Sequence, residues 1–249
     1  MKDVLFFFCI LFPSFVFSMN PNGDLEKIKS IIESEASSVW LFTGNSITQG
    51  AKHTHGQRAY PEIFAERIRG EMGRTMDVVI NTAISGHTSQ NILDGFDQRV
   101  TRFQPNVVVL MIGTNDACDD RRKVSINQFE SNLIQLIGKI RELNAIPVLL
   151  TPNPIITDKA PERKDLETYV IKIREISEKN HVILVDNWTI WNTELQEKYN
   201  GKIFKELLND PLHPNGQGHK EIAIALFKAF SIFNADAPAC GGDYYEGDH

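Results

Sequence analysis

The chain has 249 residues, of which 42% are hydrophobic and 23% are charged. This ordinary globular composition excludes wholesale disorder, and the length is sufficient for one α/β domain with a sizeable core. The net charge is −6, with 26 Lys and Arg against 32 Asp and Glu. Because the sequence also contains no run rich in Lys or Arg, we expect no nucleic-acid partner. Three cysteines are too few for a disulfide scaffold, and no C-x-x-C pair indicates structural zinc.

The first 18 residues are typical of an export signal peptide. Their apolar run, residues 4–17, is shorter than the roughly 20 residues that a membrane-spanning helix needs. We therefore expect cleavage after Ser18, a secreted or periplasmic protein and no stable membrane insertion; a retained anchor or a buried helix is the alternative. After cleavage Cys118 and Cys240 remain, and the sequence leaves open whether they form a disulfide or two independent thiols.

Segments with strand and helix patterns alternate through the rest of the chain. Short apolar runs predict strands at 39–43, 77–80, 107–112, 146–150 and 182–185. Apolar residues at helical spacing predict helices at 24–36, 61–69, 89–100, 125–143, 163–179, 188–199 and 216–233, the third of them capped by Ser89. The tail over residues 235–249 is rich in Gly and Asp and is expected to be frayed, which leaves residues 19–234 as one domain.

This alternation predicts an α/β fold, namely a three-layer α/β/α sandwich with a mostly parallel five-stranded sheet. Right-handed crossovers place helices on both faces of such a sheet. Ligand sites in these folds form beyond the carboxyl ends of the strands. Four segments that carry polar side chains or glycines lie at those ends: 43–50, 82–88, 113–120 and 151–157.

The segment Gly44-Asn45-Ser46 directly follows the first predicted strand. A serine on a tight turn between a strand and a helix exposes its hydroxyl, and its backbone N–H can face a developing oxyanion. The alternative interpretation is a plain helix cap. The nucleophile elbow G-x-S-x-G of the α/β-hydrolases is absent, because Thr48 occupies its last position.

Two further segments could supply donors to an oxyanion. Gly86 could present its backbone N–H to a ligand, although by itself it is better explained as a turn glycine. Asn115, in the segment Gly113–Asp116, offers a side-chain amide that does not titrate, which suits a fixed oxyanion contact.

Two groups of residues could in principle bind a metal ion. Asp116, Asp119 and Asp120 are hard oxygen ligands, but pairing of the last two with neighbouring arginines or solvent is the preferred interpretation. His53 and His55 form an H-x-H pair for which no third ligand is evident, so we expect them in a surface loop. We therefore expect no metal and no other cofactor.

The last segment with chemical potential is Asp210-Pro-Leu-His213. An Asp and a His three positions apart on one loop can contact each other directly. The carboxylate then fixes the tautomer of the imidazole, whose other nitrogen is left to accept a proton from a serine. Asn215, two residues further on, is expected to cap the final helix.

Together these segments resemble the conserved blocks of the SGNH hydrolases, also called the GDSL esterase/lipase family. The blocks occur in the family's order, as Gly44-Asn45-Ser46, Gly86, Gly113–Asp116 and Asp210–His213. The resemblance implies the flavodoxin-like sandwich of that family and assigns Ser46 as nucleophile, His213 as base and Asp210 as its orienting acid. It also implies an oxyanion hole made of the Ser46 N–H, the Gly86 N–H and the Asn115 side chain.

One residue departs from the family pattern, since Asn45 stands where the family usually has Asp. Asn keeps the acceptor oxygen and loses the charge, so we expect altered local electrostatics and retained activity. The resemblance implies a secreted serine esterase, and a carbohydrate O-acetylesterase is favoured, because export, the modest size and the absence of a long apolar lid point to a short acyl group. The alternatives are a lysophospholipase or thioesterase for longer chains, and a non-catalytic carbohydrate-binding relative.

The expected partner is a small-molecule or carbohydrate ester, and the oligomeric state stays open. The loop after the fourth strand carries four residues suited to binding hydroxyls, namely Thr151, Asn153, Thr157 and Asp158. Trp188 and Trp191 lie three apart on a predicted helix and could form a platform for a sugar, although a core-facing pair is the favoured interpretation.

Overall fold

The computed structural model describes residues 21–50 and 53–243, so the predicted signal peptide, residues 1–18, lies outside the described residues. Five parallel strands form one sheet in the order β2-β1-β3-β4-β5. They are β1 (Val39–Gly44), β2 (Val78–Asn81), β3 (Val107–Met111), β4 (Ile146–Leu150) and β5 (Ile183–Val185). The predicted five-stranded parallel sheet is confirmed, with strand boundaries within two residues of those expected.

The alternation of side chains along each strand divides the core into two apolar layers. In β1, Trp40 and Phe42 pack into one layer while Leu41 points into the other. Val107 and Val109 of β3 join the first layer. Because both faces of the central strands are fully buried, their apolar runs lack the alternation with polar residues seen in half-exposed strands.

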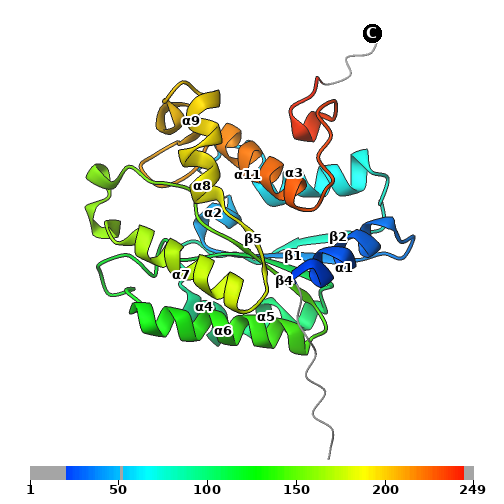
Figure 1. Ribbon diagram of the computed structural model, residues 1–249, viewed down its shortest axis with the longest axis horizontal. Coiled ribbons are helices and arrows are strands. Elements are labelled where there is room, and N and C mark those ends of the chain that lie inside the picture. Colours follow the sequence, from blue (N-terminus) through cyan, green and yellow to red (C-terminus); the bar gives the residue numbers. More distant parts are fainter. Residues whose placement is uncertain (1–20, 51–52, 244–249) are drawn as a thin grey trace, which may run out of the picture.

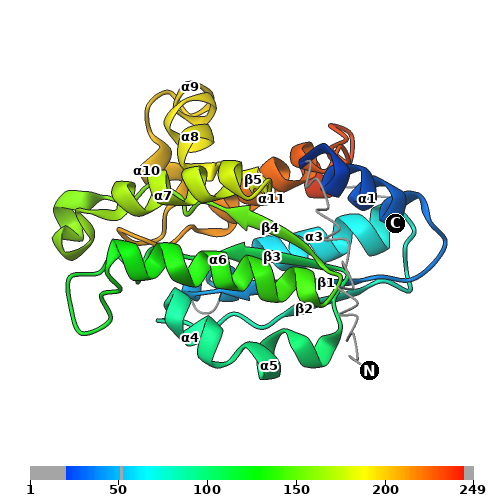
Figure 2. The same ribbon diagram turned by 60° about the horizontal axis from the view of Figure 1, so that its bottom comes forward.

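Helices cover both faces of the sheet and complete the predicted three-layer sandwich (Figure 1). The layer of Trp40 is covered by α1 (Pro21–Glu33), α3 (Tyr60–Ala65), α8 (Asn187–Asn192) and α11 (Gly216–Ala229). The opposite layer is covered by α4 (Ser89–Asp94), α5 (Phe96–Arg99), α6 (Ile126–Glu142) and α7 (Leu166–Lys179). These helices lie below the sheet in Figure 1, and Figure 2 turns this side of the molecule toward the viewer. The short helices α2 (Ser46–Gln49), α9 (Glu194–Lys198) and α10 (Ile203–Leu207) lie in connections.

Several helices differ from the sequence prediction in their bounds. The segment 89–100 divides into α4 and α5 at Gly95, and its cap is Thr88, whose hydroxyl accepts from the backbone of Asn91 while the Asn91 side chain accepts from the N–H of Thr88. The segment 188–199 divides into α8 and α9 at Thr193. The segment after α3 continues as a wider π-helical turn over Glu66–Glu71, and α10 was not predicted.

The tail is packed rather than frayed as far as residue 243. Pro238–Cys240 form a single helical turn, η5, and Ala237, Ala239 and Cys240 are buried in the same apolar layer as α11. The N–H of Ala239 also donates to Glu71 Oε1 at 2.8 Å. Of the alternatives left open for the cysteines, the structure has two free buried thiols, Cys118 and Cys240. None of the helices within the described ranges is long and apolar enough to span a membrane.

Candidate active site

Ser46 lies on a sharp turn at the carboxyl end of β1. The turn starts at Gly44, whose φ of +154° and whose contact with β3 require glycine, since an added Cβ would lie 2.3 Å from the carbonyl oxygen of Met111. Asn45 then caps α2, with Oδ1 accepting from the N–H of Ile47 at 3.1 Å. Ser46 is the first residue of α2, so the serine stands at a helix N-terminus, as the sequence predicted.

Asp210 and His213 lie on a tight loop between α10 and α11. The loop is closed by a bridge between Leu208 and Pro214 and by the N–H of Asn209, which donates to the carbonyl of His213 at 2.8 Å. Within it, Asp210 Oδ1 accepts from the N–H of Leu212 at 2.8 Å and from that of His213 at 2.9 Å. These bonds turn the carboxylate toward the imidazole ring of His213.

Side chains from the two loops form a continuous hydrogen-bonded chain. Ser46 Oγ lies 2.8 Å from His213 Nε2, and His213 Nδ1 lies 2.8 Å from Asp210 Oδ2. Burial raises the pKa of Asp210, but hydrogen bonds from Leu212 and His213 outweigh it, so the pKa lies below the ordinary value. The ionised carboxylate only accepts, so Nδ1 of His213 carries a proton and, in the neutral ring, Nε2 is free to accept the serine proton.

Gly86 and Asn115, the other two residues of the predicted oxyanion hole, are linked through the backbone carbonyl of His87. The Asn115 side chain, at the end of β3, donates from Nδ2 to the carbonyl of His87 at 3.0 Å, next to Gly86. The loop of Gly86 is tied to α2, because the N–H of Ser85 donates to Gln49 Oε1 at 2.8 Å. Among the described residues, neither the N–H of Gly86 nor that of Ser46 has a hydrogen-bond acceptor. Both donors are therefore available to a ligand.

Behind this loop lies a buried polar cluster that the sequence did not predict. Asp116 is fully buried, and its Oδ1 accepts from the N–H of Ser89 at 2.8 Å and from its hydroxyl. Asn132 Nδ2 donates to the same hydroxyl at 2.9 Å. Burial raises the pKa of Asp116 to about 6, against the effect of its hydrogen bonds. Asp119 pairs with a lysine and Asp120 with an arginine, so the three aspartates do not converge on a cation site.

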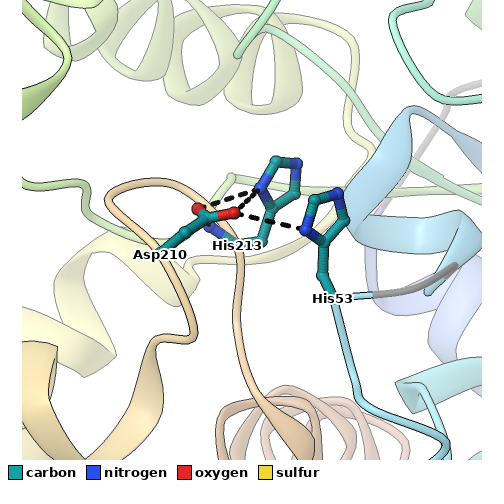
Figure 3. Close-up of side chains that lie close together, drawn as sticks. All are labelled: His53, Asp210 and His213. Atoms are coloured by element: carbon teal, nitrogen blue, oxygen red, sulfur yellow. Dashed lines mark hydrogen bonds and ion pairs between the residues drawn. The ribbon is translucent and has the colours of Figure 1, made fainter.

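His53 lies in a turn, as expected, but its side chain is directed inward rather than toward solvent. It is 15% exposed and contacts both His213 and Asp210 (Figure 3). Its ring stacks on that of His213, with centroids 3.5 Å apart and planes 3° from parallel. Its Nδ1 lies 3.2 Å from Asp210 Oδ2. His55 is not part of this group, because its Nε2 contacts Asn209 Oδ1 instead, so the H-x-H spacing pointed to only one of the residues at the site.

Other polar and aromatic candidates are occupied by the fold. Thr151 and Asn153 are fully buried; Thr151 donates to Asp186, and Asn153 Nδ2 donates to the carbonyl of Leu212 at 3.2 Å. They hold the loops in place rather than offering groups to a sugar hydroxyl. Trp191 is fully buried in the core, and the ring of Trp188 packs partly buried against the other apolar layer. The core-facing interpretation of the tryptophans is therefore confirmed for Trp191.

Comparison with known proteins identifies relatives over most of the chain. The model of the GDSL-like Lipase/Acylhydrolase family matches residues 42–221. An acetylxylan esterase from Geobacillus stearothermophilus is 25% identical over 204 residues, which cover 76% of this chain and 91% of that protein. Thioesterase 1/protease 1/lysophospholipase L1 of Escherichia coli is 27% identical over 115 residues, 46% of this chain and 51% of that protein. The crystal structure of an alpha/beta hydrolase enzyme from the metagenome of Lake Arreo superposes with a TM-score of 0.69 at 23% identity, covering 82% of this chain and 99% of that one.

Proposed function

The chain belongs to the GDSL-like lipase/acylhydrolase (SGNH) family and is a carboxylic ester hydrolase, and we propose that it removes acetyl groups from carbohydrates through an acyl-serine intermediate. The observation that carries the mechanism is the unbroken hydrogen-bonded chain from Ser46 through His213 to Asp210. The family and the esterase class predicted from the sequence are confirmed, while the residue roles and the substrate are proposals.

In the first half of the proposed reaction, Ser46 Oγ attacks the ester carbonyl as its proton passes to Nε2 of His213. Asp210 keeps the ring in the required tautomer and stabilises the imidazolium that forms. The carbonyl oxygen becomes an oxyanion, which accepts hydrogen bonds from the N–H groups of Ser46 and Gly86 and from the Asn115 amide. Nε2 then protonates the leaving alcohol as the ester C–O bond breaks, leaving acetate esterified to Ser46.

In the second half, a water molecule replaces the alcohol. His213 takes a proton from that water, whose oxygen attacks the acyl carbon, and the same donors stabilise the second oxyanion. Collapse of the tetrahedral intermediate breaks the bond to Ser46 Oγ, which recovers its proton from His213. The enzyme returns to its starting state and releases acetic acid, so the proposed cycle needs no cofactor.

The alignments favour an acetyl group on a carbohydrate. The acetylxylan esterase aligns over 91% of its length, against 51% for the lysophospholipase. The hydroxyl-binding role predicted for Thr151 and Asn153 is withdrawn, because both are buried.

The proposal is tested by comparing acetyl, butyryl and octanoyl p-nitrophenyl esters, followed by acetate release from acetylated xylan. Each well-buried methylene contributes about 0.8 kcal/mol, so an enzyme for long chains shows kcat/KM rising steeply with chain length. We expect the acetyl ester to be the best substrate. An octanoyl optimum without acetate release would instead assign the chain to the lipid-directed alternative.

A second experiment separates the enzyme from a non-catalytic carbohydrate-binding relative. A fluorophosphonate labels an activated serine, and we expect it to modify Ser46 in the intact protein. Ser46→Ala should abolish labelling and lower kcat by about 10³-fold or more while leaving the fold intact. Near-normal esterase activity in the Ser46→Ala variant would refute the proposed mechanism with Ser46 as nucleophile.

Export of the protein is likewise proposed, on the basis of the apolar run at residues 4–17. Expression of the full chain in a bacterium, followed by N-terminal sequencing of the mature product, checks it. A product beginning at Met19 supports export, and an intact N-terminus in the cytoplasmic fraction contradicts it.

A further inference from the structure

A short loop holding two histidines is attached to the loop that holds Asp210 and His213. His53 Nδ1 contacts Asp210 Oδ2, and two residues later His55 Nε2 hydrogen-bonds to Asn209 Oδ1. The two loops are about 155 residues apart in sequence, yet neighbouring residues of one contact neighbouring residues of the other. The attachment therefore fixes where the His53 ring lies relative to the proposed catalytic groups.

Both rings contact the same carboxylate, but only one of them is hydrogen-bonded to it. Asp210 accepts from two backbone N–H groups and from Nδ1 of His213, and these hydrogen bonds hold its pKa below the ordinary value. Because the two rings are stacked and parallel, one oxygen cannot lie in the planes of both, and the hydrogen bond to Oδ2 is that of His213. Nδ1 of His53 lies 3.2 Å from the same Oδ2, a contact that becomes an ion pair when His53 is protonated.

The stacked rings also interact electrostatically. When His53 is protonated, its positive charge lies about 3.5 Å from the His213 ring and disfavours a second positive charge there. The same charge neutralises part of the Asp210 carboxylate, which would otherwise stabilise a cationic His213. A further histidine close to them is His219 in α11, which accepts from the N–H of Tyr60. Burial, together with the charges on His213 and His53, lowers the pKa of His219 to about 3, so it stays neutral. Within the described residues, two imidazoles therefore compete for one carboxylate.

We propose that His53 is a positioning residue for the esterase reaction: it orients Asp210 and the ring of His213, and its own protonation keeps His213 in the proton-accepting form at mildly acidic pH. This inference rests on the proposed function, because it concerns the base of that reaction. His53 takes up no proton from the reactants in the proposed mechanism, so it acts through its contacts with His213 and Asp210.

A metal site is the alternative reading of the same three residues, since their ligand atoms lie within 4.8 Å of one another. The stacking geometry argues against it. The lone pair of each Nδ1 lies in the plane of its ring, and the two planes are parallel and separated by the stacking distance. One ion cannot lie in both planes at the usual distance of about 2.0–2.1 Å, so binding would require one ring to leave the stack.

Two substitutions separate the functions of His53, and a third controls for the loop. His53→Asn keeps a donor close to the position of Nδ1 and removes both ring and charge. His53→Phe keeps a stacking ring and removes both donor and charge. His55→Gln is the matched control, because it replaces the other imidazole of the loop while retaining a donor toward Asn209.

The readouts are kcat, KM and the pH profile of kcat/KM for an acetyl ester. We expect His53→Phe to lose about tenfold in kcat with KM within about twofold, because the Asp210 carboxylate is no longer held in its position relative to the His213 ring. His53→Asn should recover most of that loss. In both variants the acid limb of the profile should move to higher pH by about one unit, since His213 then protonates without competition. His55→Gln should match the wild type in every readout.

The outcomes distinguish the inference from the proposed function on which it rests. If Ser46→Ala retains activity, the proposed function is wrong. If Ser46→Ala is inactive but His53→Phe and His53→Asn keep the wild-type kcat and acid limb, only the inference about His53 is wrong. If His53→Phe does not fold, as judged by circular dichroism, His53→Asn alone decides through its acid limb. Loss of activity on dialysis against EDTA, restored by Zn²⁺, would replace the positioning role with a metal site.

Discussion

Asp116 should make the stability of the protein fall as the pH rises through the mildly acidic range. The carboxyl is fully buried, and within the described residues its Oδ2 has no hydrogen-bond partner. Burial raises its pKa from 3.8 to about 6. The folded state therefore binds a proton that the unfolded state releases between about pH 4 and pH 6, so this stabilisation is complete below pH 4 and is lost as the pH rises to 6.

The size of the effect follows from the two pKa values. One pKa unit corresponds to 1.36 kcal/mol, so a rise of about two units is worth about 3 kcal/mol of unfolding free energy. Asp116→Asn removes the titration while keeping an acceptor for the N–H and hydroxyl of Ser89. Its amide nitrogen takes the place of Oδ2, and burying that donor without a partner costs about 1–3 kcal/mol at every pH.

The assay is urea unfolding of wild type and Asp116→Asn at several values between pH 4 and pH 7. Other groups titrate in this range too, so the informative quantity is the difference in unfolding free energy between the two proteins at each pH. We expect the variant to be less stable at pH 4 and to gain about 3 kcal/mol relative to wild type by pH 7. Asp94→Asn, an exposed change on α4, is the control. A difference between wild type and Asp116→Asn that is constant with pH would refute the reasoning.

Three further substitutions test other parts of the structure. Asn115→Ala should lower kcat by about 10²- to 10³-fold with a smaller change in KM, because its amide acts mainly as charge develops; a raised KM with normal kcat, measured on an acetyl ester, would make it a ground-state contact. Asp77→Ala should cost about 3–5 kcal/mol in urea unfolding, because it leaves the buried guanidinium of Arg74 without its carboxylate partner. Gly44→Ala should abolish both folding and activity, as judged by circular dichroism and ester hydrolysis, because its Cβ would collide with the carbonyl of Met111; a folded, active variant would show that β1 and β3 can separate there.

The sheet could be predicted from the sequence because its signal is local. A run such as 107–112, apolar throughout and bounded by polar residues, has few alternatives to a buried strand, and alternating helices then require parallel pairing. Helix ends were harder, because they depend on single residues. Gly95 interrupts one helical pattern, and the cap at Thr88 depends on a reciprocal bond with Asn91 that no periodicity reveals.

The candidate site could be predicted only where its residues belong to one motif. Ser46, Asp210 and His213 lie in recognisable blocks, and each block follows an element whose end is visible in the sequence. His53 lies in a loop without such a block, and its contact with Asp210 depends on how two distant loops fold against each other. Likewise, Thr151 and Asn153 looked like binding groups because polar residues at a strand end can equally serve a ligand or the neighbouring backbone.

The anchoring of the loop between α10 and α11 has a consequence for inactivation by heat. Its backbone is bonded at both ends and in the middle: the carbonyl of Leu212 accepts from the buried Asn153, and the carbonyl of Pro211 accepts from the N–H of Ile156. Releasing Asp210 and His213 would thus mean detaching the loop that follows β4 as well, so the candidate site has little freedom to unfold on its own. Esterase activity and the far-ultraviolet circular dichroism signal should therefore disappear over the same temperature interval. The rate of ester hydrolysis would then report the fraction of molecules in which the whole α/β/α sandwich is folded.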